Sequence, residues 1–168
     1  AIKNRGEVPF MRPALLANSK SPEIKTWEHA IRFLNKKNDI DYFVSVPTTA
    51  PLRKTSDIDK CINKAIRERL DIVFTATKSV KNPYFNILKL SKKKLNVVCK
   101  SKKKISRRQD APTCYDLTTA CYVFKPKYIM NNKNIFQGKT GLVLIPKERA
   151  IDIDDKIDYK IAKFLSFK

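Results

Sequence analysis

A chain of 168 residues with 42% hydrophobic side chains is long enough for one α/β domain with its own core. Its 36 Lys and Arg residues outnumber 16 Asp and Glu residues, and the formal net charge of +20 favours anionic partners, either nucleic acid or nucleotides and sugar acids. The chain contains no long apolar run and no signal peptide, so we expect no membrane span and a cytoplasmic protein.

The cysteine and lysine patterns disfavour two further classes. The four cysteines show no Cys-x-x-Cys spacing and His29 is the single histidine, which argues against a structural zinc site and for a reducing cytosol. The two densest lysine runs, Lys92–Lys94 and Lys102–Lys104, contain no interleaved aromatic residues of the kind that stack on bases. Nucleic-acid binding is therefore the less favoured interpretation of the charge.

The first half of the chain alternates between helix and strand signals. Residues 21–23, Ser-Pro-Glu, are typical of a helix start, and apolar residues at helical spacing predict an amphipathic helix over residues 22–37. Residues 41–46 are a short apolar run rich in β-formers, which predicts a buried strand. A second helix follows, with Ser56 expected as its cap, and residues 72–77 form the second strand. This order predicts a βαβ unit with parallel strands.

The first predicted strand leads into a proline-stiffened loop, Pro47–Arg53. In open α/β sheets the loops at the carboxyl ends of the strands form the ligand site. The hydroxyls of Thr48 and Thr49 and the guanidinium of Arg53 are therefore candidate ligand-binding groups. The competing interpretation is a rigid strand-to-helix turn in which Arg53 pairs with a surface acid, and the spacing leaves both open.

A charge-rich, hairpin-like segment at about residues 84–106 interrupts the alternation. Segments that leave the main sheet often make subunit contacts, so we expect a dimerisation excursion and a homodimer. After it, β-runs occur at residues 118–124 and 141–145, with a short helix at residues 126–131 between them. A last amphipathic helix, residues 156–167, is expected to cover the sheet.

An acidic stretch, Ile151–Asp158, lies between the last predicted strand and the last helix. Side chains alternate in an extended segment, so Asp152 and Asp154 would point one way while the isoleucines pack the other. Two adjacent carboxylates repel each other unless a cation or a proton lies between them, and such oxygen ligands suit Mg²⁺ that carries substrate phosphates. An acidic helix start capped by Asp154 is the alternative, and both interpretations can hold at once.

Four separated stretches of the chain resemble, in order, motifs of the acylneuraminate cytidylyltransferases, also called CMP-sialic acid synthetases. These stretches are Glu7–Pro13, Ser45–Arg53, Arg107–Pro112 and Ile151–Asp154. The similarity covers nearly the whole chain, and four motifs in the right order are more specific than any one of them. The resemblance implies a Rossmann-like nucleotidyltransferase fold, a three-layer α/β sandwich with a mostly parallel sheet.

The resemblance also implies an enzyme that transfers CMP from CTP to a nonulosonic acid, a nine-carbon sugar acid, with Mg²⁺ and release of pyrophosphate. Asp152 and Asp154 would hold Mg²⁺ on the phosphates of CTP, and one of the pair could take the proton from the attacking hydroxyl. Arg108 would bind the carboxylate of the sugar, a task suited to a planar, charged fork. The other implied substrate-binding residues are Thr48, Thr49, Arg53, Lys78, Asn82 and Tyr84.

The chain departs from the family's pattern at two points. The family's first strand and its phosphate loop, rich in Gly, Arg, Ser and Lys, have no counterpart in residues 1–168, so we expect a single, N-terminally incomplete domain. Pro47 stands where many members carry a glutamine that touches the sugar, which leaves the identity of the sugar open. The alternatives to an enzyme are a catalytically inactive remnant that dimerises or binds anionic sugars, and a basic nucleic-acid-binding domain.

Overall fold

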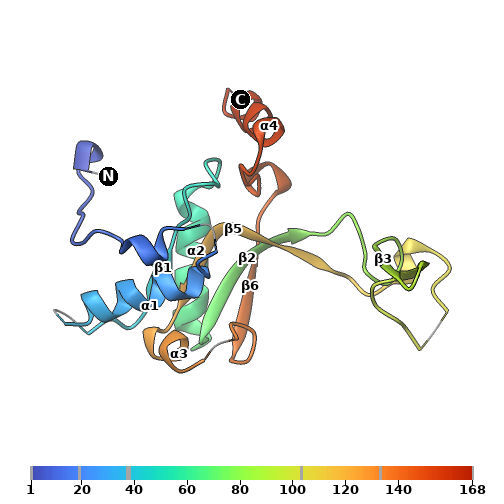
Figure 1. The fold of residues 1–168 in the computed structure, drawn as a ribbon, viewed down its shortest axis with the longest axis horizontal. Helices are drawn as coiled ribbons and strands as arrows, with labels where there is room; N and C mark the ends of the chain where they lie inside the picture. Colours follow the sequence, from blue (N-terminus) through green and yellow to red (C-terminus); the bar gives the residue numbers. More distant parts are fainter. Residues whose placement is uncertain (1, 19, 37–38, 103, 133, 168) are drawn as a thin grey trace.

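The computed structural model describes residues 2–167 apart from residues 19, 37, 38, 103 and 133. Its main sheet has four strands in the order β1-β5-β2-β6 (Figure 1). The strands are β1 (Phe43–Ser45), β2 (Ile72–Lys78), β5 (Tyr115–Phe124) and β6 (Thr140–Leu144). Because β2 is parallel to β6 and antiparallel to β5, and β1 is also antiparallel to β5, three of these four strands share one direction. The mostly parallel α/β sheet is therefore confirmed, with β5 reversed.

Helices lie on both faces of this sheet, in the predicted three-layer arrangement. On one face α2 (Thr55–Arg67) buries Cys61 and Ala65 against Val73, Cys121 and Val123. On the other face lie α1 (Glu23–Leu34) and α3 (Pro126–Asn131), with a core that contains Trp27, Ile31, Phe74, Tyr122, Phe124 and Ile129. Alternate residues of β2 and β5 serve the two cores because strand side chains alternate between faces.

The predicted βαβ unit is present, but its two strands are not neighbours. The antiparallel strand β5 lies between β1 and β2, so α2 crosses over it. Phe124 of β5 packs against both β1 and α1 on one face of the sheet, with ring centroids 5.2 Å from Phe43 and 4.8 Å from Trp27. This aromatic cluster fixes β1, and with it the loop that follows β1, against α1.

The boundaries of α1 and α2 differ from the prediction, and α4 is shorter than predicted. α2 begins at Thr55, before the expected cap Ser56, and the N–H of Lys54 donates to Oδ2 of Asp57 at 3.0 Å. Asp57 therefore serves the first turn, which a carboxylate at the third helical position commonly does. α1 ends at Leu34, and Lys37, the last residue of the predicted helix, lies outside the described residues.

The predicted excursion is a separate two-stranded hairpin of β3 (Leu88–Ser91) and β4 (Lys94–Val97). A 3-10 turn, η3 (Arg108–Asp110), follows it before the chain returns to the sheet as β5. In Figure 1 the excursion projects well away from the four-stranded sheet. Lys103, in the second predicted lysine run, lies outside the described residues.

The last helix, α4 (Lys156–Leu165), does not cover the sheet as predicted. It stands beyond the end of β6 (Figure 1), and its apolar residues Ile157, Ile161 and Phe164 are exposed. The chain leaves β6 through the 3-10 turn η4 (Lys147–Arg149) and then turns outward, which carries α4 off the sheet. Two further 3-10 turns, η1 (Ile2–Asn4) and η2 (Ala14–Leu16), precede α1. Among the described residues no helix is long and apolar enough to cross a membrane.

Candidate active site

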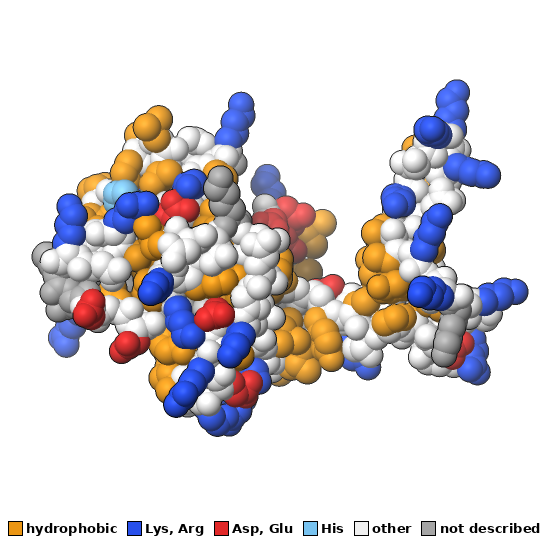
Figure 2. Space-filling model, turned by 90° about the horizontal axis from the view of Figure 1, so that it is seen from below, with side chains coloured by type: hydrophobic (Ala, Val, Ile, Leu, Met, Phe, Trp, Pro, Cys, Tyr) orange, Lys and Arg blue, Asp and Glu red, His pale blue; other side chains and the backbone are white. Residues whose placement is uncertain are grey.

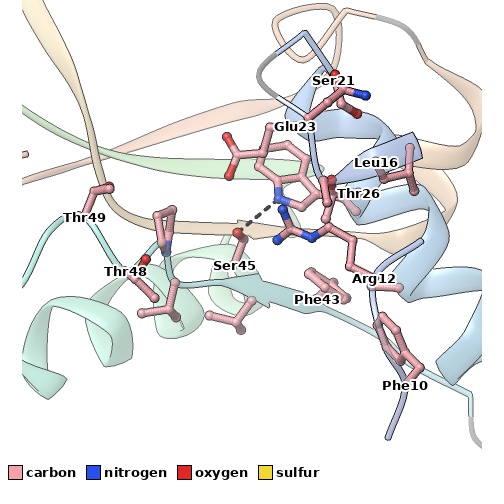
Figure 3. Close-up of a pocket in the computed structure, with 17 residues that line it drawn as sticks. Phe10, Arg12, Leu16, Ser21, Glu23, Thr26, Phe43, Ser45, Thr48 and Thr49 are labelled. Atoms are coloured by element: carbon pink, nitrogen blue, oxygen red, sulfur yellow. Dashed lines mark hydrogen bonds between the residues drawn. The ribbon is translucent and has the colours of Figure 1, made fainter. Parts of the chain in front are cut away.

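A cavity of about 550 Å³ opens between β1 and α1 (Figure 3). Thr48 and Thr49, predicted as ligand-binding residues, line it directly after the end of β1. The rest of the wall comes chiefly from α1 and the N-terminal connector, with Phe10, Arg12, Glu23 and Trp27. The carboxyl end of β1 therefore forms a concave site, as the carboxyl ends of strands in open α/β sheets generally do.

Aromatic contacts hold the walls of this cavity in place. The ring of Phe10 packs on Phe33 and His29 of α1, at centroid distances of 4.8 and 5.1 Å. Nε1 of Trp27 donates a hydrogen bond to Oγ of Ser45 at 3.0 Å, which joins α1 to β1 (Figure 3). The N-terminal connector is therefore fixed on α1 at Phe10. This contact places one wall of the cavity opposite the threonine loop.

Arg53 braces the threonine loop from within. Its guanidinium donates to the carbonyl of Pro47, to that of Ala50 at 2.7 Å and to that of Ala120 at 3.2 Å. These partners are backbone carbonyls, not the surface acid considered as an alternative. Burial lowers the pKa of Arg53, and the nearby carboxylate of Asp152 opposes this effect. The side chain of Arg53 therefore holds the backbone of the loop, and its direct contact with a substrate stays a prediction.

The acidic segment lies beside the same loop. The N–H of Ile153 donates to the carbonyl of Thr49 at 2.8 Å. One carboxylate oxygen of Asp152, Oδ1, is buried and has no hydrogen-bond partner in the described part of the chain. A buried carboxylate oxygen without a partner is unfavourable, and a bound cation would satisfy it. Asp152 could therefore supply one oxygen ligand to a bound cation such as Mg²⁺.

Glu23 adds a second carboxylate to this region. Burial raises the pKa of Glu23, Trp27 and Arg12 oppose the shift, and Asp152 adds to it. Burial also raises the pKa of Tyr122 to about 12, and the carboxylates of Glu23 and Asp152 contribute. Negative charge is thus concentrated beside β1, where a cation or a proton would relieve the repulsion.

Asp154 and Asp155 have different roles. Asp155 caps α4, since its Oδ1 accepts from the N–H groups of Ile157 at 2.6 Å and Asp158 at 2.9 Å. Asp158 completes a capping box by accepting from the N–H of Asp155 at 3.1 Å. The acidic helix start is therefore confirmed, but its assignment to Asp154 is wrong by one residue. The carboxylate of Asp154 is exposed and lies outside this cap.

Protein side chains supply only part of a metal site here. Within the described ranges no three His, Cys, Asp or Glu side chains gather into a group that could hold a metal ion. Mg²⁺ in nucleotide sites is commonly bound by one or two carboxylates together with substrate phosphates. An ion at Asp152 and Asp154 would therefore depend on phosphate oxygens for its remaining ligands.

Arg108 and Lys78 line a second cavity, of about 380 Å³, at the base of the excursion. Arg108 belongs to η3, and the exposed ion pair between Arg107 and Asp110, at 3.0 Å, spans this turn. Two cationic side chains at one cavity suit an anionic group such as a carboxylate.

Asn82 lines the second cavity as well, but its side chain also shapes the local loop. Its Nδ2 donates to the carbonyl of Pro112 at 2.8 Å, and its Oδ1 accepts from the N–H of Tyr84 at 2.9 Å. Tyr84 lines a different cavity, of about 430 Å³, together with Cys99 and Lys104. The structure therefore places Asn82, but not Tyr84, at the cavity of Arg108.

The two groups of predicted site residues lie apart in one copy of the chain. The cavity beside β1 and the cavity at the excursion share no residue among those described. In Figure 1, η3 (yellow) lies with the projecting excursion, far from the segment that leads to α4. Asp152 is brought to the threonine loop, while Arg108 is brought to Lys78 and Asn82.

Several residues of the site had no predicted role there. The sequence indicates Glu23 as a first-turn acid of α1 and Arg12 as part of an extended connector, since nothing local links either residue to the loop after β1. No sequence pattern marks Arg149, yet it donates from Nε and Nη2 to the two carboxylate oxygens of Asp57, both at 2.9 Å. Its place three residues before Asp152 is the only available signal.

The fold is similar to that of a solved nucleotidyltransferase. The crystal structure of 4-diphosphocytidyl-2C-methyl-D-erythritol synthase from Anaerococcus prevotii matches with a TM-score of 0.58, over 90% of this chain and 68% of that chain, at 17% identity. At this level of identity the likeness shows a shared fold. No protein-family model matches the chain.

Relatives in sequence show the family to which the chain belongs. Post-translational flagellin modification protein B of Campylobacter coli and CMP-N,N'-diacetyllegionaminic acid synthase of Campylobacter jejuni are each 33% identical over 168 residues, which cover 98% of this chain and 70% of each relative. Pseudaminic acid cytidylyltransferase of C. jejuni is 25% identical over 166 residues. The chain belongs to the acylneuraminate cytidylyltransferase-like family and is an enzyme of the cytidylyltransferase type.

Proposed function

We propose that this enzyme transfers CMP from CTP to a nonulosonic acid and releases pyrophosphate. The observation that carries the proposal is the buried, unpartnered oxygen of Asp152, held beside Thr49 at the carboxyl end of β1. The names of the relatives, which include a CMP-N,N'-diacetyllegionaminic acid synthase and a pseudaminic acid cytidylyltransferase, favour sugar acids of these two types as substrates.

In this reaction the anomeric hydroxyl of the sugar attacks the α-phosphorus of CTP in line, and pyrophosphate leaves. Asp152 and Asp154 would hold Mg²⁺, which would neutralise charge on the phosphate oxygens. Thr48 and Thr49 line the cavity in which the nucleotide is oriented, and orientation lowers the barrier further. A carboxylate of the Asp152/Asp154 pair accepts the proton released by the attacking hydroxyl.

The carboxylate of the sugar is assigned to Arg108, with Lys78 beside it. The guanidinium can donate two parallel hydrogen bonds to a carboxylate, which fixes the orientation of the sugar as well as its charge. Because this cavity lies apart from Asp152 within one copy, we assign the completed site to a homodimer, in which the excursion of one copy reaches the nucleotide cavity of the other.

The excursion has the exposed apolar surface that such a dimer needs. Leu88 pairs with Val97, and Leu90 pairs with Leu95, on one face of the hairpin. Leu90 and Leu95 are 71% and 66% exposed. Figure 2 shows hydrophobic side chains gathered along the projecting arm and at its junction with the body, flanked by Lys and Arg. A two-stranded hairpin with an open apolar face is marginal in water unless it packs on a partner.

The test is pyrophosphate release from CTP and Mg²⁺ with each of three sugar acids, legionaminic, pseudaminic and N-acetylneuraminic acid. We expect release that requires one of these acids and is lost on chelation of the metal. Asp154→Asn should lower turnover at saturating Mg²⁺ by about a hundredfold, since it removes an interaction with the reacting phosphates. Unchanged turnover of Asp154→Asn would remove this residue from the mechanism.

A matched control uses Asp59→Asn, which makes the same chemical change on the exposed side of α2 and should leave turnover unchanged. Arg108→Lys should raise the KM for the sugar acid by about tenfold without changing the KM for CTP, because lysine cannot form the two-bond fork. Absence of sugar-dependent pyrophosphate release from the wild-type chain would instead favour a binding protein with this fold.

A further inference from the structure

Asp57 and Arg149 form a buried ion pair, and neither residue has a role in the proposed reaction. Asp57 is fully buried, and the side chain of Arg149 is 19% exposed. Nε and Nη2 of Arg149 each donate to one oxygen of Asp57 at 2.9 Å, which is the two-bond fork of guanidinium on carboxylate. Oδ2 of Asp57 also accepts from the N–H of Lys54 at 3.0 Å. Both carboxylate oxygens are therefore committed in a fixed geometry.

The pair joins the two segments that carry the candidate active site. Asp57 follows the threonine loop by eight residues from Thr49, on the first turn of α2, and Arg149 precedes Asp152 by three residues. The N–H of Ile153 donates to the carbonyl of Thr49 at 2.8 Å on the other side of Asp152. Asp152 is therefore held from both directions.

Burial alone does not explain an ion pair at this place. Desolvation of two charges commonly offsets their attraction, so a well-packed apolar pair would stabilise the fold as well or better. What the fork supplies is orientation, because two parallel hydrogen bonds fix both the direction and the distance of the approach. Ala150, next to Arg149, packs against the core cluster that contains Ala50, so the chain beside Arg149 is also anchored.

We propose that Asp57 and Arg149 are positioning residues that set the carboxylate of Asp152 against the Thr48–Thr49 loop. The meaning of this for catalysis rests on the proposed function, in which Asp152 holds Mg²⁺ on the nucleotide phosphates. Neither residue of the pair touches a substrate in this assignment, and both act through the backbone that carries Asp152.

The first test measures how firmly the segment around Asp152 is held, and it does not require enzymatic activity. Arg149→Lys and Asp57→Glu keep both charges but break the fork, so two independent conservative variants report on one contact. In amide hydrogen exchange followed by NMR, each should lower the protection of the Ile153 N–H by about tenfold, while the amides of Val73 and Val123 in the core strands keep theirs. Unchanged protection of Ile153 in both folded variants would overturn the proposal.

The matched control is Arg67→Lys, the same substitution in an exposed ion pair of α2 with Glu68. It should change neither the protection of Ile153 nor any kinetic constant, because exposed pairs contribute little.

The second test separates positioning from simple stabilisation. If wild type releases pyrophosphate, Arg149→Lys should raise the Mg²⁺ concentration for half-maximal rate by about tenfold and lower kcat, with an unchanged KM for the sugar acid. A purely structural role would lower the Tm and leave the Mg²⁺ dependence unchanged, which would contradict the proposal. If wild type releases no pyrophosphate, the proposed function fails, and the exchange of Ile153 still decides whether the pair positions Asp152.

Discussion

The hydroxyl group of Thr75 forms hydrogen bonds where the regular pairing of the main sheet is interrupted. The register between β2 and β5 shifts between Phe74 and Thr75, which leaves backbone groups of β5 without their regular strand partners. Oγ1 of Thr75 accepts from the N–H of Cys121 at 3.1 Å and from Oγ1 of Thr118 at 2.8 Å. All three residues are buried, so these hydrogen bonds have no water to replace them.

Thr75→Val should therefore lower the free energy of unfolding by about 2 kcal/mol, because it leaves the buried N–H of Cys121 without a partner. Urea unfolding measures the change. The matched control is Thr119→Val in the neighbouring strand β5: Oγ1 of Thr119 is buried without a hydrogen-bond partner among the described residues, so removing it should cost nothing. Equal losses in the two variants would contradict this account.

Asp71 makes stability depend on pH. The N–H of Lys139 donates to its Oδ2 at 2.9 Å and Nζ of Lys125 to its Oδ1 at 3.0 Å, and these two contacts hold the pKa of Asp71 below its usual range. A carboxylate with a lowered folded-state pKa adds stability above its unfolded-state pKa, and this stability is lost as the pH falls through the folded-state value.

Asp71→Asn should accordingly destabilise the protein at pH 7, and its difference from wild type should shrink as the pH is lowered below the ordinary aspartate pKa of about 4. Urea unfolding at a series of pH values measures this. Asp59→Asn, on the exposed side of α2, controls for the change in net charge. A difference between Asp71→Asn and wild type that is the same at pH 3 and pH 7 would refute the linkage.

Among the elements, the hairpin of the excursion has an unfavourable turn. Lys92 and Lys93 connect β3 to β4 with φ of 49° and 63°, the left-handed region that side chains other than Asn and Gly adopt at a cost. Two-residue hairpin turns of this kind favour Asn followed by Gly. The two lysines therefore weaken the hairpin, and they place positive charge at its tip.

The double variant Lys92→Asn with Lys93→Gly should stabilise the hairpin locally by about 1 kcal/mol. Hydrogen exchange of the β3 and β4 amides, compared with amides of β2, measures the effect. Lys94→Gly, one residue into β4, is the control and should lower protection because glycine weakens a strand. If the double variant also lowered protection, the turn would not be limiting.

α4 shows that an amphipathic pattern predicts a helix but not the surface on which the helix packs. Its helical spacing and its acidic start were readable from the sequence, and the helix forms where expected, with Asp155 as the cap. However, the sequence of a helix does not indicate which surface its apolar side chains will pack against. The outward turn after η4 leaves Ile157 and Ile161 exposed, and nothing within the helix itself could have indicated that.

At the scale of the whole molecule, the excursion predicts a homodimer. Sedimentation equilibrium should find the wild-type chain dimeric, and Leu90→Asp should shift it toward the monomer, because a charge on the apolar face must be desolvated in the contact. The control is Lys89→Asp, one residue away on the opposite face of β3, which changes the net charge by more and should leave the dimer intact. A monomeric wild type would exclude the arrangement.

The same variant tests whether the site is completed across the dimer. Leu90→Asp should lose sugar-dependent pyrophosphate release while it still binds CTP and Mg²⁺, since the cavity beside β1 belongs to one copy. Full activity of a monomeric Leu90→Asp chain would instead place Arg108 and Asp152 in a single-copy site.

The sequence by itself determined the α/β class, most helices and strands, and the threonine loop and acidic segment as candidate site pieces, because periodicity, proline spacing and charge are local properties. Only the tertiary structure decided that β5 would lie antiparallel between β1 and β2, that Arg53 would brace a loop, and that Arg149 would pair with Asp57. Such pairings depend on which segments meet after folding. Residues 92 positions apart carry no local signal of their contact, so the position of Asp152 is a property of the folded chain.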